Sequence, residues 1–368
     1  MFEKAVALDS HYAEAYARLG GTYRVEWIWR WSGDPQMLEH VLAFAQKALA
    51  LNDSLPGAHA VLGMGYASKQ QYEQALAEEE RAIALDPNNA DSYVFQAEVL
   101  NFAGRPADAL RAVERAMRLN PRYPPGYLVN LGWAYYSTGR YTEAIATLQD
   151  LSSRNPNFMS AHLFLAASYL LQWIAQQSPP RQTLEPAMAA VQRALALNDA
   201  YYQNHIILGA IALHQQQYEQ ALAEMKRAVG LNPTDALSYA ALAEVLSRMG
   251  RPEEGLEAAA KALRLKPEAV DGHLAFVGIA YTVAGHYEDA RTPLQRYLSH
   301  YPNFLPAHLM LAAVYSELGQ VAEAQAEAAE VLRLNPQFSL EVHKQRMPIK
   351  EPAVLERHLA DLRKAGLK

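Results

Sequence analysis

An internal duplication constrains this chain more than any other feature. The eight residues Gln71–Glu78 recur unchanged as Gln217–Glu224, at an offset of 146 residues. The same offset relates Ala48–Asp53 to Ala194–Asp199, again without a substitution. Inside each copy a shorter period of 34 residues is visible. A period of this length is typical of a solenoid, in which each repeat buries its apolar face only against its neighbours.

The repeat that runs from Pro56 to Asn89 shows the underlying pattern. Recurring residues spaced three or four apart define one face on each of two successive helices. These residues are His59, Leu62, Gly63 and Tyr66 in the first helix, and Ala75, Glu79 and Ala82 in the second. Pro87 then stops the second helix, because proline lacks the N–H donor and its ring clashes with the preceding turn.

This pattern resembles the tetratricopeptide repeat family, which has a large residue, Leu-Gly, Tyr, Ala, an aromatic residue, Ala and Pro at those positions. The resemblance covers nearly the whole chain and implies an all-α, right-handed superhelical solenoid. We count about nine two-helix repeats, which span 13–55, 56–89, 90–123, 125–158, 159–201, 202–235, 236–269, 271–304 and 305–338. Repeats one to four (13–158) duplicate as repeats five to eight (159–304), and 305–338 begins a third cycle.

The two ends depart from the repeat. Residues 1–12 read as the second helix of a leading repeat whose first helix is missing. Residues 339–368 form a tail, in which 352–363 is amphipathic and is expected to cap the last repeat. We interpret this tail as a solvated capping element in preference to a binding tail.

Small residues predict how closely the helices of one repeat cross. Gly63 and Ala221 occupy positions where a larger side chain would force the two helices apart. Between the helices a glycine recurs, which predicts a left-handed helix cap. The glycines are Gly104, Gly139, Gly250, Gly285 and Gly319, and Pro106 and Pro252 then begin the next helix in two repeats.

Two repeats, 13–55 and 159–201, each carry nine extra residues between their helices. We expect about one extra turn per helix and a longer loop, which ends near 32–35 and 178–180. Trp27 and Trp173 match at the offset of 146 residues, so their surroundings are predicted to be equivalent.

Composition excludes several classes of function. The formal net charge is −6 with both signs mixed, which does not favour nucleic acid. Cysteine is absent, so there is neither a disulfide nor a thiolate metal site, and the chain starts directly in a repeat pattern without a signal peptide. The apolar stretch 273–285 is too short to span a bilayer. We therefore predict a cytoplasmic protein with no membrane partner.

Sequence motifs for chemistry are also missing. Of the twelve histidines, His59, His162, His205 and His308 share one repeat position, which indicates packing and not metal ligation. The remaining histidines show no metal-binding spacing, and 63–65 has no phosphate-loop context. We predict no catalytic residue, no metal and no cofactor, and hence no enzyme.

The family resemblance implies a working surface, because the first helices of such repeats line a concave groove. The groove residues mapped onto this chain are Glu98, Asn101, Phe102, Trp133, Tyr136, Leu163, Leu170, Leu171, Ile206, His214, Glu244 and Arg248. We predict that this groove binds a protein or peptide segment, with Trp133, Tyr136, Leu163 and Leu171 as one accessible apolar patch. The alternative is that a tight superhelix buries part of this stripe against itself. The family's carboxylate clamp is absent, since Ala60, Val94 and Met64 stand at clamp positions.

The tail supplies a second hypothesis. Residues 334–340 and 362–367 are similar to the C-terminus of bacterial proteins in which a nucleotide cyclase domain precedes a long tetratricopeptide region. The chain would then be a regulatory or assembly arm of a larger signalling enzyme. The sequence leaves open whether the chain forms a homo-oligomer.

Overall fold

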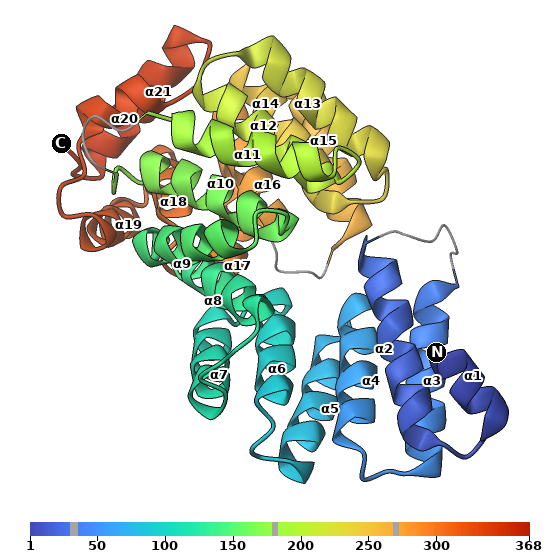
Figure 1. The fold of residues 1–368 in the computed structure, drawn as a ribbon. Coiled ribbons are helices and arrows are strands. Elements are labelled where there is room, and N and C mark those ends of the chain that lie inside the picture. Colours follow the sequence, from blue (N-terminus) through green and yellow to red (C-terminus); the bar gives the residue numbers. More distant parts are fainter. Residues whose placement is uncertain (30–35, 179–182, 268–271) are drawn as a thin grey trace. The chain divides into compact units, whose positions relative to one another are not determined.

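The chain folds into consecutive helices joined by short loops. The computed structural model describes residues 1–29, 36–178, 183–267 and 272–368, and no strand occurs among them. Contacts divide the chain into unit 1 (Met1–Ala134) and unit 2 (Tyr135–Lys368). The all-α repeat fold is therefore confirmed (Figure 1). The boundary at 134 lies inside the first copy of the duplication, so the division by sequence offset stays a prediction about the repeats.

Unit 1 begins with a short helix and continues as helix pairs. Its helices are α1 (Phe2–Leu8), α2 (Ala13–Trp29), α3 (Met37–Leu51), α4 (Pro56–Ser68), α5 (Tyr72–Leu85), α6 (Ala90–Phe102) and α7 (Pro106–Leu119). Helix α8 (Pro125–Ser137) begins in unit 1 and ends in unit 2. The two helices of each repeat pack on one another, and the first helices α2, α4 and α6 also contact in sequence.

Unit 2 continues the same alternation and adds two helices at its end. Its helices are α9 (Tyr141–Arg154), α10 (Met159–Ile174), α11 (Glu185–Leu197), α12 (Tyr202–His214), α13 (Tyr218–Leu231), α14 (Ala236–Arg248), α15 (Pro252–Leu265), α16 (Gly272–Ala284), α17 (Tyr287–Leu298), α18 (Leu305–Glu317), α19 (Val321–Leu334), α20 (Leu340–Arg346) and α21 (Pro352–Lys364). The first helices α10, α12, α14, α16 and α18 contact one another in order. We call this row the first-helix face of unit 2.

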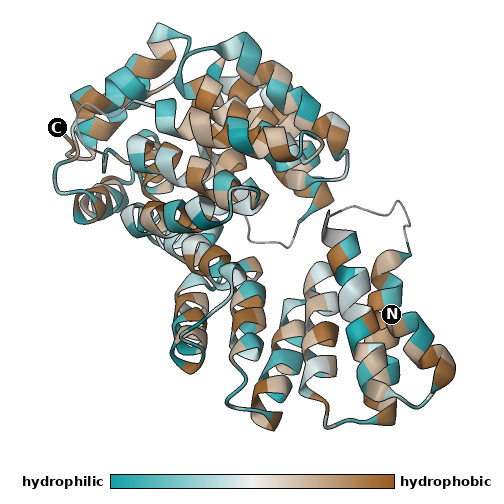
Figure 2. Ribbon diagram, viewed as in Figure 1, coloured by the Kyte–Doolittle hydropathy of each residue, from teal (hydrophilic) through white to brown (hydrophobic). Residues whose placement is uncertain are grey.

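The hydrophobic core of each unit extends along the row of repeats and does not gather at one centre. Figure 2 shows apolar and polar residues mixed along every helix, as expected when each repeat buries one stripe against its neighbours. Alanines at the helix crossings are fully buried, among them Ala75, Ala109, Ala221 and Ala290. A Cβ at Gly63 would lie 2.8 Å from Oε1 of Glu79 and 3.0 Å from the Ala75 carbonyl oxygen. The predicted close crossing is therefore present.

The loops inside the repeats confirm the predicted left-handed caps. Gly104, Gly139, Gly250, Gly285 and Gly319 all have φ between 70° and 82°. The sequence pattern missed that Gln70, Gln176 and Gln216 take the same conformation, with φ of 61°, 56° and 61°. The residue after each glutamine closes the loop with a main-chain bond, such as Gln71 N–H to the Tyr66 carbonyl at 2.9 Å. Three repeats thus hold a non-glycine residue in a conformation that costs free energy.

The two lengthened repeats contain longer first helices, as predicted, but the extra turn expected in each second helix is absent, since α3 has 15 residues and α11 has 13, against 14 in α5 and α13. Helix α2 has 17 residues and α10 has 16, whereas α4, α6 and α12 have 13 each. The predicted loop ends near 32–35 and 178–180 fall mainly outside the described residues. The surroundings of the Trp27 side chain are outside them too, so the equivalence of Trp27 and Trp173 stays a prediction.

The tail folds back onto unit 2. Helix α21 forms where the sequence predicts a capping helix and packs on α18 and α19, with Leu359 and Leu362 fully buried. The short helix α20 was not expected, since its residues carry no repeat pattern. Main-chain bonds close this region, including Leu340 N–H to the Lys368 carbonyl at 2.7 Å.

Candidate interaction surfaces

The predicted groove residues of unit 1 lie together on α6 and α8. The Phe102 ring meets the Trp133 ring edge-on, with 4.8 Å between centroids. Phe102 is 43% exposed, which is unusual for a side chain of this size, and Trp133 is partly exposed. Glu98 forms an ion pair with Arg24 of α2 at 2.5 Å. This surface therefore combines an exposed aromatic ring with a partly buried ion pair.

Asn101 differs from these neighbours because it is buried. Its Nδ2 donates to the Asn130 carbonyl at 3.4 Å, whereas its Oδ1 has no hydrogen-bond partner among the described residues. Only 2% of the residue is exposed, so Asn101 mainly ties α6 to α8.

A buried carboxyl lies behind this surface. Glu79 of α5 is 0% exposed, and neither carboxylate oxygen has a hydrogen-bond partner in the described part of the chain. Burial raises its pKa well above the ordinary range; nearby Arg24 opposes this shift, and Glu98 and Glu78 add to it. Such a group stays protonated over a wider pH range than a surface glutamate. The repeat pattern places Glu79 on the recurring face of the second helix but does not indicate that its carboxyl is buried without partners among the described residues.

The predicted groove residues of unit 2 are mostly covered. Leu163, Leu170 and Ile206 are no more than 5% exposed. Tyr136 and Leu171 are partly buried and pack against the core of unit 2, and burial raises the pKa of Tyr136 to about 12. This corrects the expectation that Leu163 belongs to an accessible patch. Ile206 shows the physical reason, because neighbouring repeats pack around it in one core that includes Ala240 and Val277.

Glu244 and Arg248 form a buried ion pair on α14. Their side chains approach to 2.8 Å and are 8% and 4% exposed. Burial raises the pKa of Glu244, whereas the adjacent Arg248 lowers it and so moderates the shift. Arg248 Nη1 also approaches the Met347 sulfur at 2.7 Å, and the Arg248 carbonyl accepts from Lys350 N–H at 2.9 Å. The tail therefore covers this pair.

Three histidines lie where the tail meets α12 and α14. His343 of α20 and His358 of α21 approach through their Nε2 atoms at 3.3 Å, and His214 of α12 faces the Arg346 carbonyl at 3.4 Å. Burial, followed by the positive charge of Arg248, lowers the pKa of His214 and of His358 to about 3. Burial and the neighbouring His358 lower the pKa of His343 well below its ordinary range. All three rings are thus held neutral.

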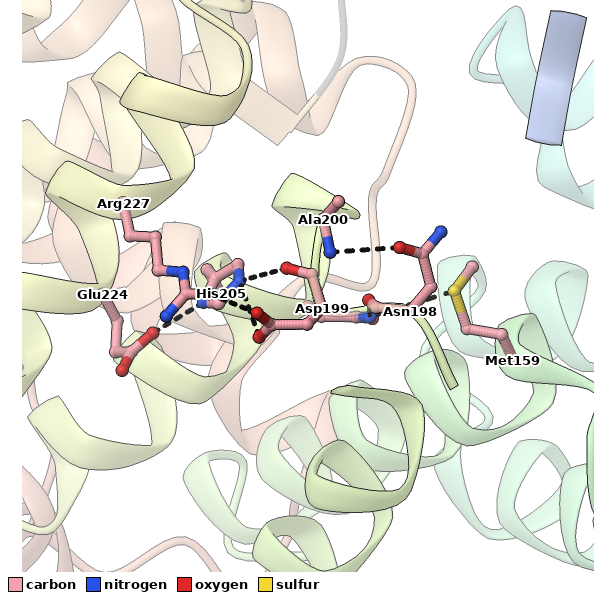
Figure 3. A network of polar contacts seen from close by, with 8 residues as sticks. Met159, Asn198, Asp199, Ala200, His205, Glu224 and Arg227 are labelled. Atoms are coloured by element: carbon pink, nitrogen blue, oxygen red, sulfur yellow. Dashed lines mark hydrogen bonds and ion pairs between the residues drawn. The ribbon is translucent and has the colours of Figure 1, made fainter. Parts of the chain in front are cut away.

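The histidines that share one repeat position are structural, as predicted. In Figure 3 His205 lies between Glu224 of α13 and Asp199 of the preceding loop. Its Nδ1 is 2.7 Å from Glu224 Oε2, and its Nε2 is 2.7 Å from the Asp199 carbonyl; Arg227 also pairs with the Asp199 carboxylate. His59 and His308 repeat this bridge with Glu78 and Glu327 at 2.6 and 2.5 Å. The histidine joins both helices of a repeat to the loop before them.

The chain matches two sequence models described as tetratricopeptide repeat. One matches residues 100–168 and 281–344, and the other matches 60–126, 186–236 and 240–303. The chain belongs to the tetratricopeptide repeat family. Tetratricopeptide repeat proteins are generally protein–protein interaction scaffolds, and membership supports that role here. Neither model concerns a nucleotide cyclase, so the similarity of the tail to cyclase-type proteins stays a prediction.

Solved structures with similar folds include the human IFIT1 dimer with PPP-AAAA, at 15% identity and a TM-score of 0.58, covering 88% of this chain and 73% of that one. The Cut9–Hcn1 hetero-tetramer of APC/C has 18% identity and a TM-score of 0.54, and the match covers 94% of this chain and 72% of that one. A tetratricopeptide repeat protein of Thermus thermophilus, TTC0263, has 25% identity and a TM-score of 0.47, and the match covers 54% of this chain and 99% of that one. The first two show the fold alone. No curated protein matches the sequence.

Neither a metal site nor a membrane-spanning helix occurs among the residues that the structure describes. No group of three or more histidine, aspartate or glutamate side chains is arranged to hold a metal ion. Within the same ranges, every helix is too short or too polar to cross a bilayer.

Proposed function

We propose that this tetratricopeptide repeat chain is a non-catalytic scaffold that binds a segment of a partner protein on the first helices of unit 1. The observation that carries the proposal is Phe102, an exposed ring packed edge-on against Trp133. Aromatic residues in such positions contribute most of the affinity in many interfaces. The Arg24–Glu98 pair beside them offers both charges to the rim of a bound segment.

The predicted groove residues of unit 2 enter this proposal differently. Leu163, Leu170 and Ile206 are buried, so we assign them to packing. We therefore place the proposed binding surface on α6 and α8 of unit 1.

A photoreactive phenylalanine analogue at position 102 tests the proposal. We expect it to crosslink, in the source cell, to a small set of proteins, with the crosslinks mapping to one segment of each. The matched control is the same analogue at Leu332 of α19, which is 41% exposed on a second helix. Purified partner should then bind Phe102→Ser about tenfold or more weakly than wild type. Equal crosslinking at both positions, or unchanged affinity of a folded Phe102→Ser variant, would refute the proposal.

A further inference from the structure

Residues 339–350 lie on the first-helix face of unit 2 in the manner of a bound peptide. Gln176, which follows α10, contacts Ser339 twice: its Nε2 donates to the Ser339 carbonyl and its Oε1 accepts from Ser339 N–H, both at 3.0 Å. At the other end Lys350 N–H donates to the Arg248 carbonyl at 2.9 Å. These bonds involve the main chain at the two ends of the segment, where the backbone is not helical, so they do not depend on its side chains.

Side chains between these two points supply the chemical selectivity. The Arg346 guanidinium lies 4.5 Å from the centroid of the Trp173 ring and also donates to the Trp173 carbonyl. Met347 and Ile349 are only 6% and 7% exposed, and Ile349 lies beside Thr282 and Val283 of α16. An arginine on an aromatic ring, followed by two buried apolar residues, is a recognisable binding motif.

The segment and the helix that follows it share one hydrophobic core. Leu340, Met347 and Ile349 of the segment belong to it together with Leu359 and Leu362 of α21. Helix α20 has seven residues, and among the described helices its main neighbour is α21. The segment is therefore held to the rest of unit 2 by apolar burial and, at the first helices, by the Gln176, Trp173 and Arg248 contacts.

We propose that the first-helix face of unit 2 is a second binding groove, that residues 339–350 occupy it as an intramolecular ligand, and that a partner segment of the same chemistry displaces them. That chemistry is a short helix that ends at an arginine, followed by Met-x-Ile or a similar apolar pair that leaves the helix in an extended conformation. This groove is separate from the surface proposed in unit 1. A tethered segment competes at a high effective concentration, so an external segment binds weakly until the tail is loosened.

A fluorescein-labelled peptide with the sequence of residues 336–352 is the probe, and the full chain is the receptor. Fluorescence anisotropy should show about tenfold or more tighter binding to a chain carrying Arg346→Ala and Met347→Ala than to wild type. The double substitution removes the ring contact and the buried thioether from the tail while the groove keeps its own residues. A chain with Lys344→Ala is the control and should bind as wild type does.

The same peptide carrying the two alanines should bind the double variant about tenfold or more weakly than the unsubstituted peptide. Equal binding of both peptides, or no binding to a double variant with native helical content, would overturn the proposal. If the double variant does not fold, the proposal is tested instead by hydrogen exchange of the wild-type chain, measured with and without about 1 mM peptide. Exchange should then rise in 339–350 while α21 stays protected, and an unchanged pattern would overturn the proposal. A Phe102→Ser chain should bind the peptide as wild type does, which separates this test from that of unit 1.

Discussion

Units 1 and 2 carry the same carboxylate at equivalent positions and use it differently. Glu98 and Glu244 are related by the offset of 146 residues. In unit 1 Glu98 pairs with Arg24 of a different repeat, and the exposed Phe102 follows on the same helix. In unit 2 Leu170 stands at the position of Arg24, and Arg248 stands at the position of Phe102.

The exchange of arginine between these two positions has a structural consequence. Arg248 pairs with Glu244 within one helix, and both its guanidinium and its main-chain carbonyl contact the tail. Phe102 at the same position of unit 1 leaves an aromatic ring in solvent. Duplication thus preserved the scaffold while two substitutions changed what the first-helix face presents.

A second pair of equivalent positions separates the units in the core. Glu79 of unit 1 corresponds to Met225 of unit 2, and both residues are almost fully buried. The helix crossing around them is the same: a Cβ at Gly63 would meet Glu79 at 2.8 Å, and one at Gly209 would meet Met225 at 2.9 Å. One unit therefore buries an ionisable group where the other buries a thioether.

The largest expected difference between the units is their response to acid. The folded tail holds His343 and His358 neutral, with the pKa of His358 lowered from 6.5 to about 3. Their stabilising contribution is complete above the ordinary pKa and is lost as the pH falls from 6.5 toward 3. At about pH 5 the His358 ring disfavours folding of the tail by about 2 kcal/mol, and His343 acts in the same direction. Hydrogen exchange, corrected for intrinsic rates, should show α20 and α21 opening before α4 and α5 do.

Other ionisable groups near the tail set the limits of this acid response. His214 of α12 adds to it, and Arg248 of α14 discourages protonation of all three rings, while Glu244 stays paired with Arg248. Burial and hydrogen bonding to Glu317 raise the pKa of Asp361 to about 6, despite nearby Lys364, so Asp361 favours the folded tail as the pH falls. A chain with His343→Leu should lose part of the acid response. An identical pH profile for this variant and wild type would contradict the assignment.

The difference in stability that comes from Glu79 is smaller. It should disappear when Glu79 is replaced by methionine, the residue at the equivalent position of unit 2. Glu79→Met is expected to stabilise unit 1 by about 1–4 kcal/mol, because it removes a buried carboxyl without hydrogen-bond partners among the described residues. Because the folded pKa is raised, Glu79 costs stability as the pH rises above its ordinary value of 4.5. Thermal melts followed by exchange in α4 and α5 should show a gain that grows with pH.

The reciprocal Met225→Glu variant is the matched control and should destabilise unit 2. Glu79→Gln should remove the pH dependence without adding an apolar side chain. If Glu79→Met melts at a lower temperature than wild type at neutral pH, the Glu79 carboxyl stabilises the fold and the prediction is wrong.

The smallest effect compares the two histidine bridges. His205→Ala and His59→Ala each remove two hydrogen bonds and should cost about 1–2 kcal/mol. The larger loss is expected at His205, whose side chain is 2% exposed against 11% for His59, and whose loop also pairs with Arg227. Chemical denaturation of both variants measures the difference. A larger loss at His59 would mean that burial does not set the strength of the bridge.

The structural requirements of each repeat were readable from the sequence because they are local. A left-handed loop at Gly104 or Gly250, a helix start at Pro106 or Pro252 and a tight crossing at Gly63 each depend on a few neighbouring residues. The periodic recurrence of these residues then fixes the solenoid. The packing role of the repeated histidines follows in the same way, since each bridge spans one repeat.

What covers the first-helix face of unit 2 was decided only by tertiary structure. The contacts that decide it join residues far apart in sequence, such as Gln176 with Ser339 and Arg248 with Met347. Residues 339–350 follow no repeat, so no periodicity predicts where they pack. The sequence likewise placed Leu163 and Phe102 on one stripe, whereas the fold buried the first and left the second exposed. Periodicity assigns a residue to a helix face, but burial depends on which distant segment meets that face.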